Sequence, residues 1–221
     1  MARPRRVRVG RADRELRLPP AAFDEIDPEF VVLEPATRLL RIYAPAVHNA
    51  TPAGFRTQGP YSRFDHQRPA PDGGPRNDRE RGILYAGRSF TCVVGEFFGD
   101  QGEIALAGVH LARLTVTEPL RLLDLRGTAA TGAGTIAAIA AVTQRATTQA
   151  WARWWYEHPR LAGVRGLLYA ASHSGEDAVA LTERSRGGIV CRSGHHWPLE
   201  DPSLADDLEL AAHRLRLVIV R

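Results

Sequence analysis

The stretch GILYAGRSFTCVVGEFFGD, residues 82–100, contains the strongest local structural signals in the chain. Its first part, 82–87, is a short apolar run that is typical of a buried strand. Its second part, 89–100, has an apolar stripe at helical spacing, formed by Val93, Val94, Phe97 and Phe98. Ser89 stands where it can accept a hydrogen bond from the first turn, so we predict a capped helix here.

Strands and helices alternate irregularly on both sides of this stretch. Residues 38–44 are strand-like, and segment 45–82 is rich in Pro, Gly, Asp and Arg, which indicates a long loop. Residues 136–158 predict one long helix or a helix pair. Further strand-like runs lie at 104–116, 120–125, 164–172, 178–184 and 214–220. Because regular βαβ spacing is missing, we expect an α+β fold with flanking helices around a mixed sheet.

The positive charge of the chain is concentrated at its N-terminal end. All 29 basic residues of the 221 are arginines, and seven of them fall within the first 17 residues, which leaves residues 18–221 with a formal charge of −1. We therefore expect a basic, flexible tail at 1–20 and a single folded domain at 21–221. Since the domain is not basic overall, direct binding to nucleic acid is not expected.

Several other classes of protein are disfavoured by the sequence. It has no run of eighteen apolar residues and no secretory signal pattern, so we expect no membrane association and a cytoplasmic location. The two cysteines, Cys92 and Cys191, are read as free thiols, although a single bridge stays open. The pair His195-His196 lacks further ligands at ordinary spacing, so no metal is expected. Segment 127–134 is glycine-rich but lacks the features of a phosphate loop.

Four side chains in order along the chain are candidates for chemistry. Arg41 ends the strand of RLLRIYAP, Arg63 lies in the loop GPYSRFDHQ, and Tyr85 lies near the end of the strand of ILYAGRS. Glu96 lies beside the apolar stripe of the following helix, where a carboxylate is costly unless it is paired or functional. Taken alone, each of these residues is more often structural than catalytic.

Together these motifs resemble the RES-domain family. The matching order is R-I-Y, S-R-F-D, I-L-Y-A and a glutamate about eleven positions after the tyrosine, followed by TQAWARWW at 148–155 and GLLYAASHSGEDAVALTER at 166–184. The resemblance covers roughly residues 38–190 and implies a fold similar to that of ADP-ribosyltransferases. It assigns catalytic roles to Glu96, Arg41 and Tyr85, and substrate binding to Arg63 and Ser172, with Ser174 as a rival for the serine. Arg88, close to Tyr85, is an additional candidate for anion binding.

The resemblance implies a toxin that cleaves the nicotinamide–ribose bond of NAD⁺. That bond has a cationic leaving group, so one carboxylate beside the ribose suffices, unlike the carboxyl pair of ordinary glycosidases. Arginine forks suit the pyrophosphate. NAD⁺ would be the substrate, with inorganic phosphate as co-substrate and no bound cofactor, and a separate Xre-like antitoxin would inhibit the enzyme. Mono-ADP-ribosylation of a protein or metabolite, and a non-catalytic domain that only binds a partner, remain alternatives.

Overall fold

The computed structural model describes residues 17–23 and 25–220. The strands are β1 (Phe30–Leu33), β2 (Arg38–Tyr43), β3 (Gln58–Gly59), β4 (Arg76–Asn77), β5 (Ile83–Gly87), β6 (Glu103–Ala105), β7 (His110–Val116), β8 (Leu120–Asp124), β9 (Gly166–Ala170), β10 (Asp177–Thr182), β11 (Ile189–Val190), β12 (His196–Pro198) and β13 (Val218–Val220). The α-helices are α1 (Phe90–Phe98), α2 (Ala129–Gly132), α3 (Arg145–Glu157) and α4 (Ala205–Leu215). Short 3₁₀ helices are η1 (Ala137–Ala141), η2 (Pro159–Leu161), η3 (Glu183–Ser185) and η4 (Pro202–Leu204).

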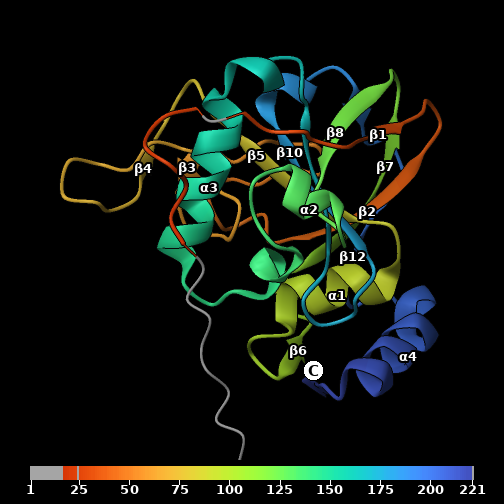
Figure 1. The fold of residues 1–221 in the computed structure, drawn as a ribbon. Helices are drawn as coiled ribbons and strands as arrows, with labels where there is room; N and C mark the ends of the chain where they lie inside the picture. Colours follow the sequence, from red (N-terminus) through yellow and green to blue (C-terminus); the bar gives the residue numbers. More distant parts are fainter. Residues whose placement is uncertain (1–16, 24, 221) are drawn as a thin grey trace, which may run out of the picture.

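A nine-stranded mixed sheet organises the fold (Figure 1). Its order is β1-β8-β9-β10-β5-β2-β7-β11, with β12 also paired to β7. Strands β8 and β9 are parallel, whereas the other pairs are antiparallel. Two small sheets, β13-β6 and β3-β4, lie outside it. The mixed sheet with flanking helices confirms the predicted α+β class.

The two faces of the sheet bury different cores. One face encloses aliphatic side chains from both halves of the sheet, such as Leu39, Leu84, Leu114 and Val179. On the other face, the tryptophans of α3 cover strands β8, β9 and β10. The helices α1 and α4 lie side by side (Figure 1), α1 packs against β2 and β5, and apolar side chains of both helices form a cluster with Ile42 of β2 and Leu111 of β7. The sheet therefore curls around one core and is flanked by helices on its outer face.

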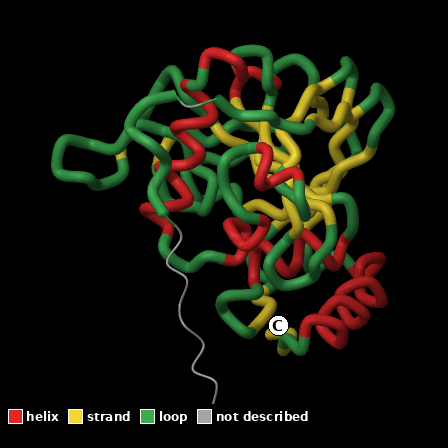
Figure 2. Tube along the Cα trace, viewed as in Figure 1, coloured by secondary structure: helices red, strands yellow, loops and turns green. Residues whose placement is uncertain are grey.

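Strands β2 and β5 form a β-ladder pair at one position only. Leu40 pairs with Gly87, whereas β2 pairs with β7 along its whole length. Beyond this pair, Arg56 rather than β2 lies next to β5, and it forms two backbone hydrogen bonds with Ile83, of 2.8 and 3.0 Å. Most of the chain between β2 and β5 is loop (Figure 2). The sheet thus opens at its centre, and a loop fills part of the gap.

Most predicted elements form, with differences in the bounds of some and in the number of strands and helices. The run 104–116 is two strands, because the chain turns at Gly108 with a φ of 70°. Of the two alternatives for 136–158, the structure has the helix pair, formed by the 3₁₀ helix η1 and the α-helix α3. The strand predicted at 214–220 is shortened to β13, and the helix α4 before it was missed, although Leu208, Ala211 and Leu215 have helical spacing.

Other expectations have mixed outcomes. Cys92 and Cys191 are both free. The predicted tail at 1–20 lies mostly outside the described residues. Within its described part, residues 17–20, the carbonyl of Arg17 accepts a 2.8 Å hydrogen bond from Trp151 Nε1. Of the helices in the described ranges, not one has the length and apolar character needed to cross a bilayer.

Candidate active site

A cavity of about 460 Å³ lies where β2 and β5 separate. Its walls come from β2, the loop that follows it, β5, α1, and the segment around the end of β9. The predicted residues Arg41, Arg63, Tyr85, Glu96 and Ser172 all line this cavity. Its size is that of a small-molecule site.

Arg41 is a buried cation in the wall of this cavity. The residue is 8% exposed, and its Nη1 donates hydrogen bonds to the carbonyls of Gly54 at 2.6 Å and Pro52 at 3.5 Å. Burial lowers the pKa of the guanidinium to about 10. Within residues 17–23 and 25–220, no carboxylate forms an ion pair with it. A buried charge of this kind is costly unless an anionic ligand completes its partners.

Arg63 joins the loop to the segment before α3. Its Nη1 donates to the carbonyls of Ala140 and Val142, the second at 3.3 Å. Partial burial, and then the nearby positive charge of Arg145, lower the pKa of Arg63. Like Arg41, it is bonded to neutral carbonyls and has no ion pair in the described part of the chain. The cavity thus has two arginines whose charge is not neutralised by a bonded carboxylate.

Glu96 projects from α1 and is held by two donors. The hydroxyl of Tyr169, on β9, donates to Oε2 at 2.8 Å, and the backbone N–H of Ser172 donates to Oε1 at 3.3 Å. Burial raises the pKa of Tyr169 well above its ordinary value, with the charge of Glu96 adding to the effect, so this tyrosine stays a donor. The carboxylate is therefore oriented at the cavity while remaining exposed to it.

The position of α1 depends on Gly87, at the end of β5. A Cβ at this glycine would lie 2.7 Å from Cys92 Sγ and 2.9 Å from Val93 Cγ1, both in the first turn of α1. Ser89 caps the helix by accepting a 3.0 Å hydrogen bond from the N–H of Cys92, as predicted. The missing side chain thus allows α1, and Glu96 with it, to pack closely against the sheet.

The hydroxyl of Tyr85 is engaged on both sides. It donates to Asp65 Oδ1 at 2.9 Å and accepts from the N–H of Phe64 at 3.0 Å. Burial raises the pKa of Tyr85 well above its ordinary value, and the neighbouring Asp65 charge adds to this. Since the hydroxyl proton is committed to Asp65, Tyr85 offers a ligand mainly the surface of its ring.

Asp65 organises the loop that carries Arg63. Its carboxylate is fully buried and accepts two hydrogen bonds from Arg56 and one each from the backbone N–H groups of Tyr61 and Ser62. Together with Tyr85, these donors satisfy a charge that would otherwise be costly to bury. The loop is thereby fixed to β5 at the floor of the cavity.

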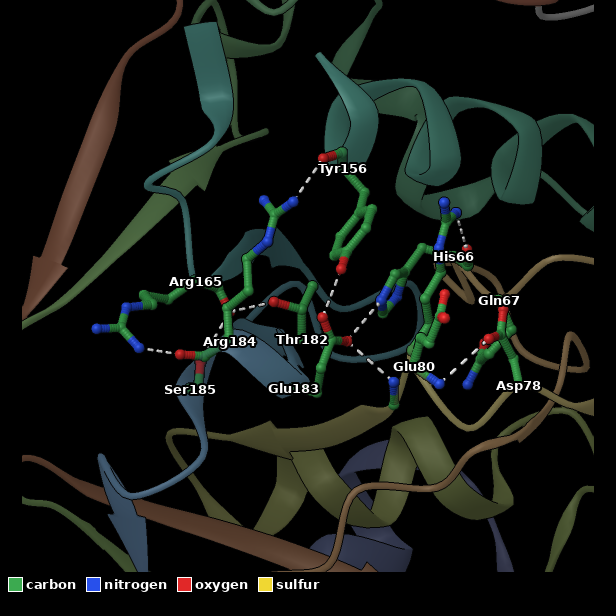
Figure 3. A network of polar contacts seen from close by, with 12 residues as sticks. His66, Gln67, Asp78, Glu80, Tyr156, Arg165, Thr182, Glu183, Arg184 and Ser185 are labelled. Carbon is green, nitrogen blue, oxygen red and sulfur yellow. Dashed lines mark hydrogen bonds and ion pairs between the residues drawn. The ribbon is translucent and has the colours of Figure 1, made fainter. Parts of the chain in front are cut away.

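A second carboxylate, that of Glu183, also anchors this loop. Glu183, after β10, accepts hydrogen bonds from His66 at 3.0 Å, Tyr156 at 2.6 Å and the N–H of Gly82 at 2.9 Å (Figure 3). Burial disfavours its ionised form, but these three hydrogen bonds outweigh burial and lower the pKa of Glu183 to about 2. His66 directly follows Asp65, so Glu183 ties the loop to α3 and β10.

Two sequence-based alternatives are placed differently by the structure. Ser172 lines the cavity, whereas Ser174 does not, and its Oγ accepts a 3.3 Å hydrogen bond from the N–H of Glu176. Arg88 is exposed and is absent from the cavity wall, although it follows Tyr85 closely in sequence. Arg88 lies between the end of β5 and the start of α1. Its proposed role in binding substrate has no geometric support.

Sequence reasoning missed several residues that line the cavity or support its wall. Tyr169 stands in the G-L-L-Y strand that precedes Ser172, and Asp65 completes the S-R-F-D motif, so both had a signal in the matched motifs. Arg145 and Asp100 have no such signal, because α3 and the end of α1 bring them together from 45 positions apart. In the described ranges, no three His, Cys, Asp or Glu side chains are arranged to hold a metal ion.

The arrangement has a clear chemical capacity. Two arginines can bind an anion in a cavity that also holds a carboxylate with a fixed orientation. That carboxylate can stabilise positive charge as it develops on a bound ligand. The tyrosine ring adds an apolar surface for a planar group.

Comparison with known proteins shows the family and the fold. The chain matches the RES domain family over residues 38–201, a segment that contains every cavity residue named above. No curated protein sequence matches the chain. Among solved structures, the fold is similar to a chain in the crystal structure of the M. tuberculosis MbcT–MbcA toxin–antitoxin complex, with a TM-score of 0.56 and 16% sequence identity. The alignment covers 81% of this chain and 92% of that chain.

Proposed function

Because this chain belongs to the RES domain family, we propose that it is an NAD⁺-degrading toxin of a toxin–antitoxin pair. It cleaves the bond between nicotinamide and ribose, and a separate antitoxin chain controls it. The fold similarity to a chain of a toxin–antitoxin complex supports the partner, and the cavity supports the chemistry.

The observation that carries the proposal is the buried, uncompensated charge of Arg41. A dinucleotide pyrophosphate carries two negative charges and presents oxygens suited to guanidinium forks. Arg41 and Arg63 both face the cavity and, in the portion of the chain described here, bond only to backbone carbonyls. A pyrophosphate between them would satisfy both charges.

Glu96 then supplies the electrostatic contribution to bond cleavage. As the C–N bond breaks, nicotinamide leaves with the bonding electron pair and becomes neutral, while the ribose acquires oxocarbenium character. The Glu96 carboxylate, held by Tyr169 and Ser172, stabilises this positive charge without moving. The ring of Tyr85 provides a surface for the nicotinamide.

Inorganic phosphate is the proposed acceptor. One of its oxygens bonds to the ribose carbon that nicotinamide leaves, which gives ADP-ribose 1″-phosphate. Phosphate requires cationic donors near the reacting carbon, and the arginines of the cavity provide them. Water would give ADP-ribose instead, and a protein acceptor would carry the ADP-ribosyl group.

The test is NAD⁺ turnover by the purified protein, with and without phosphate, followed by mass spectrometry of small molecules and of protein. Loss of NAD⁺ that increases and saturates with phosphate, with ADP-ribose 1″-phosphate as product, is expected. Glu96→Gln keeps the size of the side chain and one of its two acceptor oxygens but removes the charge, so turnover should fall by about 10²–10³. A folded wild-type protein that leaves NAD⁺ intact would refute the proposal. ADP-ribose attached to protein would indicate a transferase.

A further inference from the structure

A further arginine reaches the cavity from α3. Arg145 is the first residue of this helix, lies outside the motifs found in the sequence, and lines the cavity together with Arg63. Unlike Arg41 and Arg63, it has an acidic partner, since its Nη2 donates to Asp100 Oδ2 at 2.9 Å. Its charge is therefore neutralised in the structure described here.

This ion pair is easily broken. The Arg145 side chain is 37% exposed and that of Asp100 is 68% exposed. Ion pairs of such exposure stabilise a fold little, because water solvates the separated charges nearly as well. An anion that binds in the cavity can therefore displace Asp100 at small cost.

Asp100 keeps a second partner if Arg145 leaves. Its other oxygen, Oδ1, lies 3.0 Å from His173 Nε2, and His173 directly follows Ser172 at the cavity wall. Exchange of Arg145 from Asp100 to a ligand thus leaves no carboxylate without a donor. The three side chains come from the ends of α1, β9 and the start of α3, so the exchange needs only a side-chain rotation at Arg145.

Arg145 is also the charged group with the largest effect on Arg63. Its proximity lowers the pKa of Arg63 after the effect of burial. Two guanidinium groups this close repel each other, and an anion bound between them removes the repulsion. The pair therefore forms a natural position for a phosphate group.

We propose that Arg145 is a further phosphate-binding residue of the cavity. In the free protein Arg145 is paired with Asp100, and when the ligand binds, Arg145 exchanges Asp100 for a phosphate group of the ligand. This inference rests on the proposed function. The phosphate group belongs either to the pyrophosphate of NAD⁺ or to the inorganic co-substrate.

The experiment compares Arg145→Gln, Asp100→Asn and a control, Arg165→Gln. The control removes an arginine of similar exposure, 36%, whose ion pair with Glu118 lies outside the cavity wall. Titration calorimetry measures the affinity for pyrophosphate and for ADP-ribose, and kinetics measure KM for NAD⁺ and for inorganic phosphate. Thermal unfolding verifies that each variant is folded.

The two cavity variants should act in opposite directions. Arg145→Gln should weaken binding of the relevant anion by about 10- to 100-fold, as expected for a charge-assisted hydrogen bond. Asp100→Asn leaves Arg145 in place and releases it, so binding should be unchanged or up to about 5-fold tighter. Arg165→Gln should have no effect. A change in pyrophosphate and ADP-ribose affinity assigns Arg145 to the dinucleotide, and a change confined to KM for phosphate assigns it to the co-substrate.

Wild-type affinity of Arg145→Gln for every one of these anions would overturn the inference. Equal weakening by Asp100→Asn and Arg145→Gln would also overturn it, because the ion pair would then act only as a structural contact. The pyrophosphate measurement does not depend on catalysis. If the wild type binds pyrophosphate through Arg145 but leaves NAD⁺ intact, the proposed function fails while the anion site stands.

Discussion

Replacing Arg41 with methionine should stabilise the free protein while abolishing its affinity for the substrate. Burial lowers the pKa of Arg41 to about 10, and from an ordinary value near 12.5 this corresponds to a penalty of roughly 3 kcal/mol for the charged form. Methionine avoids that penalty and fills a similar elongated space. The variant loses the hydrogen bonds from Arg41 to the carbonyls of Gly54 and Pro52, together worth about 1.5 kcal/mol, because the second, at 3.5 Å, is weak.

The balance is a gain of about 1–2 kcal/mol in the free energy of unfolding. Gly54 is only half-buried, so its carbonyl can bind water in the variant. For a protein of this size, such a gain raises Tm by about 2–6 °C. Addition of ADP-ribose at a large excess over Kd should raise Tm of the wild type further but leave Tm of Arg41→Met unchanged.

Differential scanning fluorimetry with and without ADP-ribose measures both effects. Arg38→Met is the matched control, because Arg38 lies on the same strand but is exposed and outside the cavity. It should leave both Tm and the response to the ligand near those of the wild type. An Arg41→Met protein that is less stable than the wild type, and still responds to ADP-ribose, would refute the argument from the buried charge.

Three further predictions concern Tyr85, Glu183 and the N-terminal tail. Tyr85→Phe removes two hydrogen bonds and should lower the free energy of unfolding, measured by urea titration, by about 1–3 kcal/mol. NAD⁺ turnover should change only a few-fold because the ring remains, and a 100-fold loss would mean that the hydroxyl acts on the substrate. The folded-state pKa of Glu183 is lowered to about 2, so the stabilisation from its carboxylate is complete above the ordinary pKa near 4.3 and disappears as the pH falls towards 2. The difference in free energy of unfolding between wild type and Glu183→Gln should therefore shrink between pH 6 and pH 3, and a constant difference would contradict this. Deletion of residues 1–16, which lie outside the described structure, should leave NAD⁺ turnover intact, and its loss in a folded, truncated protein would place the tail in the site.

Local sequence patterns account for the elements around the site. The helix α1 was predictable because Ser89, its cap, and its apolar stripe are close together in sequence. Strand β5 was predictable as a short apolar run for the same reason. These signals depend only on neighbours within one or two turns, which a sequence displays directly.

Contacts between distant segments were not predictable in this way. Tyr169 and Glu96 are 73 positions apart, and only the register of β9 within the sheet brings the hydroxyl to the carboxylate. The single pairing of Leu40 with Gly87 opens the sheet, and no residue pattern in either strand indicates where pairing stops. Arg88 illustrates the opposite case, since it is close to Tyr85 in sequence but is exposed and does not line the cavity.

Gly87 sets the spacing between β5 and the helix that carries Glu96. A methyl group at this position would act as a wedge of fixed thickness between β5 and the first turn of α1. Such a wedge would shift the whole helix as a rigid body, and the carboxylate of Glu96 would move with it relative to arginines that belong to other segments. Catalytic geometry of this kind tolerates errors of only about 0.5 Å. The position of the proposed catalytic carboxylate thus depends on Gly87, nine residues earlier, because glycine has no Cβ.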